Sequence, residues 1–90
     1  MIDERQREIL VIAQEEAAEV IQEISKVFRF GIDNLHRDGI THRAKLETEV
    51  GDLLCMIDVM IDHRLIDPIQ VEIARHAKTS KLRTYSRIFQ

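Results

Sequence analysis

Residues 9–27, with the sequence ILVIAQEEAAEVIQEISKV, decide the fold class of this chain. Apolar side chains recur in this stretch at steps of three and four residues, the period of an amphipathic α-helix. The stripe that they form consists of Ile9, Ala13, Ala17, Val20, Ile24 and Val27. The pattern predicts one long helix from about Asp3 to Phe30, which Gly31 ends. Acidic residues occupy its other side. From this helix alone, a functional site and a solvated polar face explain these acids equally well.

Two more helices are predicted from their start signals. Thr41 is a suitable N-cap for a second helix that runs to about Arg64. Asp67 followed by Pro68 combines an N-cap with a proline at the first helical position. A third helix should therefore run from Pro68 to about Arg83. The segment between the first two helices contains Asp, Asn and Gly and is predicted to be a loop.

The composition agrees with one small all-α domain over residues 1–90. Three Gly and one Pro leave little material for β-turns, and the 44% hydrophobic content excludes a disordered chain. A chain of this length builds a modest core and usually needs an additional constraint. Cys55 is the only cysteine, so no internal disulfide forms, and we expect the thiol in the core. A bound metal, a partner subunit or both are therefore expected.

The sequence also points to a location inside the cell. Its apolar runs are far shorter than the ~20 residues of a transmembrane helix. The N-terminus, MIDER, lacks the basic start and apolar stretch of a signal peptide. We therefore expect a cytoplasmic protein without a membrane partner.

Charge is separated along the chain, although the net charge is only −3. Residues 1–24 carry seven acids and two bases, whereas residues 75–90 carry five bases and no acid. A basic tail of this kind either binds nucleic acid or closes on a phosphate together with the acidic head.

The second predicted helix has two apolar sides. At about 100° per residue, Cys55, Met56 and Val59 fall on the side away from the main stripe. That stripe consists of Leu46, Val50, Leu53, Leu54, Ile57 and Ile61. A helix that is apolar on two sides must be covered on both. Asp52 falls inside the smaller patch, where a lone carboxylate is costly, so we expect a positive group against it. Gly51 either permits the close approach of a helix or substrate or has no role.

Two pairs of acids share one geometry. Glu16 and Glu19 are three residues apart on the first helix, and Glu49 and Asp52 are three apart on the second. Each pair therefore points to one side of its helix. If the helices pack antiparallel, four carboxylates converge, with Glu15 close by. Oxygen ligands without Cys or His suit a hard cation such as Mg²⁺ or Mn²⁺, whereas the same carboxylates without a metal repel one another.

The acid pairs match a known pair of motifs. Residues 15–19, EEAAE, fit EExxE, and residues 49–52, EVGD, fit ExxD. Together they resemble the motifs of the all-α nucleoside triphosphate pyrophosphohydrolases, which include MazG-like proteins, dimeric dUTPases and phosphoribosyl-ATP pyrophosphohydrolase. The ending KTSKLRTYSRIF, residues 78–89, looks like the closing segment of short, phage-type MazG-like members. The resemblance implies a MazG-like helical bundle, with three main helices per protomer and a four-helix core completed by dimerisation.

The resemblance also implies a function. Such enzymes are Mg²⁺-dependent hydrolases, with Mn²⁺ as a substitute, that cleave a (d)NTP between its α and β phosphates to (d)NMP and pyrophosphate. By position, the metal ligands correspond to Glu16, Glu19, Glu49 and Asp52. Glu15 corresponds to a further motif glutamate, which holds a second metal or, with Glu16, takes part in activating the attacking water.

The basic tail then gains a candidate role. Lys78, Lys81 and Arg83 are predicted to hold the substrate phosphates from the side opposite the acids. The alternative is a solvated basic helix end, which the helix dipole favours. The expected partners are thus a nucleotide and further copies of the chain, as a homodimer or a dimer of dimers. Nucleic acid is not expected as a partner, because the net charge is negative.

Two other functions stay open. Phosphoribosyl-ATP pyrophosphohydrolysis uses the same motifs, and only a substrate assay or the genomic context separates the two activities. A non-enzymatic helical module for dimerisation or nucleic-acid binding would use the basic tail, but it leaves Asp52 without a partner.

Substrate choice rests on residues outside the acid motifs. The chain has no Trp to stack on a base, so other groups of the loop region must recognise it, with Phe28, Phe30, Asn34 and His36 as candidates. The four histidines show no metal-binding spacing and are expected at the surface. The base itself is not determined, and guanine nucleotides are one guess prompted by the phage-like ending.

Overall fold

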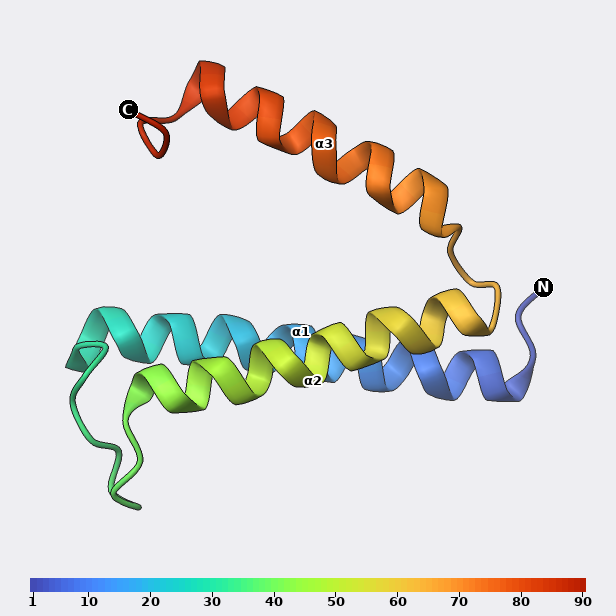
Figure 1. Cartoon of the computed structure of the whole chain (residues 1–90). Helices are drawn as coiled ribbons and strands as arrows, with labels where there is room; N and C mark the ends of the chain where they lie inside the picture. The colour runs from blue at the N-terminus through green and yellow to red at the C-terminus, as the bar shows by residue number, and fades with distance from the viewer.

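The computed structural model describes residues 1–90 and consists of three α-helices (Figure 1). They are α1 (Glu4–Phe30), α2 (His42–Asp62) and α3 (Pro68–Tyr85). There is no strand, and the only β-type pairing is an isolated bridge between Leu35 and Thr41. The predicted all-α class and its three helices are confirmed. None of the helices combines the length and the apolar character that crossing a membrane requires.

Each helix begins at a residue whose side chain accepts a backbone N–H. Asp3 accepts from the Gln6 N–H at 2.8 Å, and the Gln6 side chain accepts from the Asp3 N–H at 3.0 Å. Thr41 and Asp67 cap α2 and α3 through bonds of 3.1 and 2.8 Å. Caps of this kind contribute about 1 kcal/mol each. The helix starts could therefore be predicted, because the capping residues are visible in the sequence.

Residues with positive φ end the first two helices. Gly31 (φ 92°) ends α1, and its N–H donates to a carbonyl of the last turn at 2.9 Å. Beyond α2, the N–H of Leu65 donates to the Met60 carbonyl at 2.9 Å. The N–H of Arg64 (φ 60°) donates to the Ile61 carbonyl at 3.0 Å. These two bonds form a Schellman motif, in which glycine usually occupies the place of Arg64.

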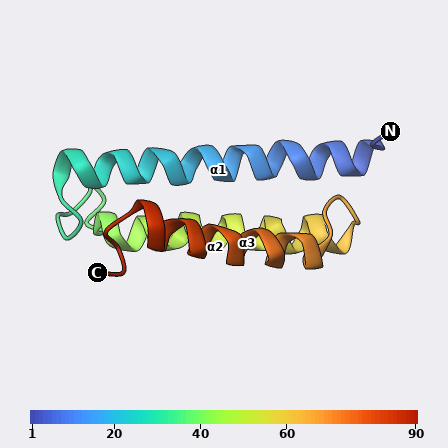
Figure 2. The ribbon, with the colours of Figure 1, turned by 90° about the horizontal axis from the view of Figure 1, so that it is seen from above.

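Helices α1 and α2 lie antiparallel and side by side (Figures 1 and 2). The loop between them is fixed against α2 by two ion pairs. Arg43 Nε lies 2.9 Å from Asp33 Oδ1, and Lys45 Nζ lies 2.7 Å from Asp38 Oδ2. The loop therefore has a defined conformation at one end of the α1–α2 pair.

His42, the first residue of α2, is the most buried side chain, with 2% of its surface exposed. Its ring stacks on Phe30 at the end of α1, with the ring centroids 5.5 Å apart. The expectation that all four histidines lie at the surface is therefore wrong for His42. The helical period alone did not indicate this burial, because the loop that folds back over His42 supplies it.

Residues 63–67 connect α2 to α3. Helix α3 then extends back along one side of the α1–α2 pair (Figure 1). Seen from above, α3 overlies α2 (Figure 2), yet it makes few contacts with either helix. The radius of gyration is 16.0 Å, whereas a compact chain of this length would have about 12 Å. The single chain is therefore open.

Little apolar surface is buried in the single chain. Ile9 and Ala13, in the α1–α2 seam, are the only buried apolar residues, and Phe28 is 86% exposed. The accessible surface is 7421 Å², roughly 2,000 Å² more than expected for a compact monomer of this mass. Cys55, expected in the core, is exposed. The chain by itself thus lacks a closed core.

Candidate metal centre

Three carboxylates meet where α1 packs on α2. Glu16 and Glu19 come from successive turns of α1, and Glu49 comes from α2. One oxygen of each lies within 4.8 Å of the other two. We call these three residues the acidic seam. The predicted convergence of Glu16, Glu19 and Glu49 is therefore present in the antiparallel pair.

Two oxygens of the acidic seam are buried without a partner. They are Oε2 of Glu16 and Oε2 of Glu49, and neither accepts a hydrogen bond. Both side chains are half-buried, whereas Glu19 is exposed. A buried carboxylate oxygen without a donor or a cation is costly. The seam thus offers unused ligand atoms beside an opening to solvent.

The pKa values of the acidic seam reflect this crowding. The pKa of Glu49 is raised from 4.5 to about 7, first by a hydrogen bond shared with Glu19, then by burial and by the charges of Glu19, Asp52 and Glu16. The pKa of Glu16 is raised by burial and then by the charges of Glu19, Asp52 and Glu15. Like charges this close favour retention of a proton. A divalent cation would take the place of that proton.

Asp52 and Glu15 border the acidic seam. The charge of Asp52 raises the pKa of both Glu16 and Glu49, so Asp52 lies close, but it does not belong to the closely spaced group. Its side chain is exposed. The expectation of a desolvated Asp52 fails, because α1 covers the second apolar side of α2 only in part: Met56 and Val59 are half-buried, whereas Asp52 stays exposed. Glu15 is exposed and adds its charge to Glu16.

The space beside Gly51 is open in this chain. No atom lies within 4 Å of the position where a Cβ would be placed on it. Of the two interpretations of Gly51, close approach by a neighbouring helix therefore receives no support within one chain. Space for a substrate or for a second chain is present there.

The donor set of the acidic seam fits Mg²⁺ or Mn²⁺. All its ligand atoms are carboxylate oxygens, which hard cations prefer. The orphaned oxygens of Glu16 and Glu49 fit as well, since a cation would satisfy both. The exposed side of the seam leaves room for water and for substrate oxygens.

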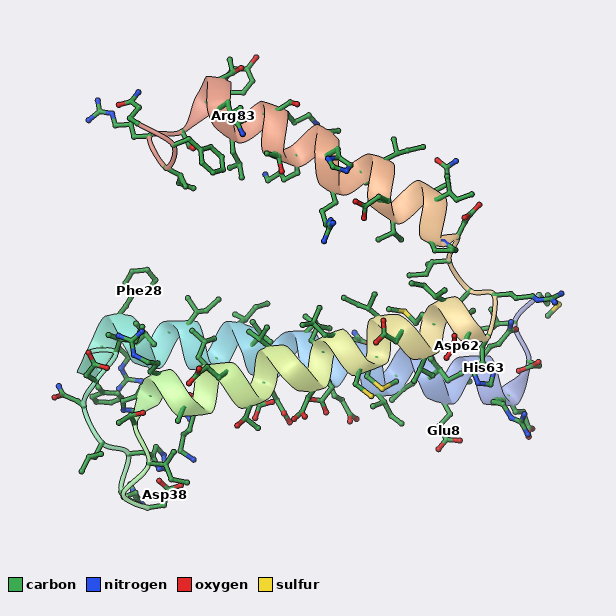
Figure 3. All side chains as sticks on the ribbon, in the orientation of Figure 1. Glu8, Phe28, Asp38, Asp62, His63 and Arg83 are labelled. Carbon is green, nitrogen blue, oxygen red and sulfur yellow. The ribbon has the colours of Figure 1, made fainter.

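The basic residues of α3 do not reach the acidic seam within one chain. Glu8 points away from α3 (Figure 3). Glu15 and Glu19, seven and eleven residues later, project on the same side of α1 as Glu8 at about 100° per residue. Lys78, Lys81 and Arg83 are exposed on α3, and the Arg83 guanidinium lies 5.0 Å from the Phe89 ring centroid. The structure thus places the predicted phosphate-binding residues on the other side of the α1–α2 pair.

Sequence reasoning missed Glu23, which is 8% exposed. Its Oε1 lies 3.3 Å from Lys26 Nζ, and its Oε2 has no partner. Glu23 comes seven residues after Glu16 and therefore projects in the same direction, toward α2. Its charge contributes to raising the pKa of Lys45 on α2. The heptad spacing from Glu16 was the signal that could have identified it.

Comparisons with protein-family models, with curated proteins and with solved structures give no match to this chain.

Proposed function

We propose that the chain is a Mg²⁺-dependent nucleoside triphosphate pyrophosphohydrolase with a MazG-like fold. The observation that carries this proposal is the convergence of Glu16, Glu19 and Glu49, with buried oxygens of Glu16 and Glu49 that lack any partner. A solvated acidic face would not bury carboxylate oxygens in a helix seam. The resemblance of EEAAE and EVGD to the pyrophosphohydrolase motifs then supplies the reaction.

In the proposed reaction, one water and one (d)NTP give (d)NMP and pyrophosphate. Mg²⁺ would neutralise phosphate oxygens and lower the pKa of a bound water. The acidic seam would hold the cation, and Asp52 would add a ligand from its exposed position. Glu15, exposed at the edge of the seam, would accept the proton of the attacking water.

We further propose that the active form is a homodimer or a dimer of dimers. The excess accessible surface of roughly 2,000 Å² per chain matches the area that obligate dimers bury. Exposed apolar side chains supply the contact surface, with Ile21, Phe28, Leu54, Ile69 and Ile73 each more than half exposed. A second copy that covers these residues would complete the four-helix core.

The proposed role of the basic residues of α3 depends on assembly. Within one chain, Glu8 points away from α3 (Figure 3), and by the helical period Glu19 of the acidic seam projects to the same side as Glu8. Lys78, Lys81 and Arg83 can hold substrate phosphates only if the assembly brings a second α3 to the acidic side. If it does not, these residues are a solvated basic helix end.

The test is pyrophosphate release from a panel of (d)NTPs and phosphoribosyl-ATP, with Mg²⁺ or Mn²⁺. We expect release from at least one substrate and a loss of at least about 100-fold in Glu49→Gln, because a ligand is removed. Glu47→Gln is the matched control, since Glu47 is an exposed glutamate on the same helix. No release from any substrate, or full activity in Glu49→Gln, would contradict the proposal. Release from phosphoribosyl-ATP alone would select the related activity.

A further inference from the structure

A pocket lies at the loop end of the α1–α2 pair, apart from the acidic seam. It has a volume of about 590 Å³, within the range of small-molecule sites. Its walls come from the end of α1, the loop and the start of α2, and include Lys26, Arg29, Phe30, His36, Arg37 and His42. Lys26 comes seven residues after Glu19, which is about 10 Å along α1. We call this cavity the loop-end pocket.

No acidic residue lines the loop-end pocket. The acids near it have partners: Asp33 pairs with Arg43, Asp38 with Lys45 and with His36 of the wall, and Glu23 with Lys26 of the wall. Neither Arg29 nor Arg37 has a carboxylate within 4.0 Å. Two guanidinium groups thus remain uncompensated at one concave site, in a protein with a net charge of −3.

The walls of the pocket are preorganised and contain an unpartnered polar atom. Nδ1 of His42 lacks a hydrogen-bond partner, whereas Nδ1 of His36 lies 3.4 Å from Asp38 Oδ1. His42 is 2% exposed, so its position is fixed by packing. The Asn34 side chain donates to the Phe30 carbonyl, and the His42 N–H donates to the Asn34 carbonyl at 3.1 Å. Buried polar atoms in proteins usually have partners, so Nδ1 of His42 is an exception in the wall of the pocket.

The pocket suits an anion better than a flat base. Phe30 is its only aromatic hydrocarbon ring, and that ring already stacks on His42 and lies 4.9 Å from the Arg29 guanidinium carbon. No free ring face is therefore offered to a base. Guanidinium groups bind phosphate oxygens through paired N–H donors. We propose that the loop-end pocket binds a phosphate group, of inorganic phosphate, pyrophosphate or a nucleotide, through Arg29 and Arg37.

The proposal is tested on the whole, metal-free protein in EDTA, by calorimetric titration with phosphate, pyrophosphate, a nucleoside monophosphate and the nucleoside. We expect the phosphate-bearing ligands to bind and the nucleoside to bind at least tenfold more weakly. Arg37→Gln, in the exposed loop, should weaken binding about tenfold, the effect of losing ~1.4 kcal/mol. Arg29→Gln should do the same, and Arg5→Gln, at the far end of α1, should change nothing. Tighter binding of the monophosphate than of pyrophosphate would assign the phosphate to a nucleotide, and the reverse order to a free anion.

Three outcomes would overturn the proposal. The first is no binding of phosphate or pyrophosphate by the wild type, and the second is unchanged binding in both arginine variants. The third is salt-dependent binding of an RNA oligonucleotide that pyrophosphate does not displace, which would mark a nucleic-acid surface. Glu49→Gln should retain phosphate binding in EDTA. The loop-end pocket and the pyrophosphohydrolase proposal can therefore fail independently.

Discussion

The acidic seam and helix α3 carry their charges in opposite ways. In the seam, three carboxylates from two helices lie within 4.8 Å of one another, and two of their oxygens are buried without partners. On α3, Lys78, Lys81 and Arg83 are spread over an exposed helix without a carboxylate partner. Crowded charge needs a counterion, whereas spread charge in water needs none. The comparison therefore makes the seam the candidate cation site and leaves the role of α3 dependent on a second chain.

The largest difference between the two regions should appear in activity. Glu49→Gln should lower the rate of pyrophosphate release by at least about 100-fold, because it removes a metal ligand. Neutralising Lys78, Lys81 and Arg83 to Gln together should lower kcat/KM by about tenfold, through weaker binding of phosphate. Steady-state kinetics on both variants checks that the loss in Glu49→Gln is the larger one. An equal loss in the two variants would contradict the comparison.

Assembly should depend on the apolar face that turns toward α3. Phe28 lies on this side of α1 (Figure 3) and is 86% exposed. Phe28→Asp should weaken dimerisation more than about 100-fold, since burying a Phe side chain is worth up to ~3 kcal/mol in each copy. Gln22→Asp, on the acidic side of α1, is the control and should leave the mass in sedimentation equilibrium unchanged. A monomeric wild type would rule out the proposed dimer.

The stability of the metal-free protein should fall as the pH rises. The pKa of Glu49 is about 7 in the folded chain and 4.5 ordinarily, so between these values the folded state holds a proton that the unfolded state has lost. This contribution is fully present below pH 4.5 and is lost as the pH rises through 7. At one protein concentration, we expect a melting temperature several degrees lower at pH 8 than at pH 5.5. Glu49→Gln should flatten this dependence, and Glu47→Gln should retain it.

The smallest effect concerns the turn that joins the α1–α2 pair to α3. Arg64 adopts φ 60° in the Schellman motif, a conformation that costs a residue with a Cβ roughly 1 kcal/mol more than glycine. Arg64→Gly should therefore raise the melting temperature by a few degrees. Gly31→Ala, at φ 92° and with Asn34 Nδ2 3.0 Å from the added Cβ, should lower it. A lower melting temperature for Arg64→Gly would indicate an additional contact of the arginine.

The three helices could be predicted because their signals are local. The apolar period of residues 9–27 and the caps Thr41 and Asp67 act within a few residues of chain. The meeting of Glu16 with Glu49 could also be predicted, because each acid pair points to one side of its helix and the two helices pack antiparallel. Local signals thus account for the fold of the α1–α2 pair and for most of the acidic seam.

The features that could not be predicted depend on which other segments of the chain, or of a second chain, pack against a residue. The helical wheel gives the direction of Asp52 but not its exposure at the edge of the acidic seam. His42 is buried because the loop returns over it, which no period in the sequence encodes. The place of α3 has no local determinant either, since α3 makes few contacts with the other two helices. Each of these three cases requires knowledge of tertiary or quaternary contacts.

Binding of Mn²⁺ to the purified protein, followed by the electron paramagnetic resonance of free Mn²⁺, tests the metal centre most directly. We expect saturable binding by the wild type and by Glu47→Gln, and at least tenfold weaker binding by Glu49→Gln. Binding should also strengthen between pH 5.5 and pH 8, as Glu49 loses its proton. Equal affinity in the wild type and Glu49→Gln, or no binding by the wild type, would contradict a metal centre in the acidic seam.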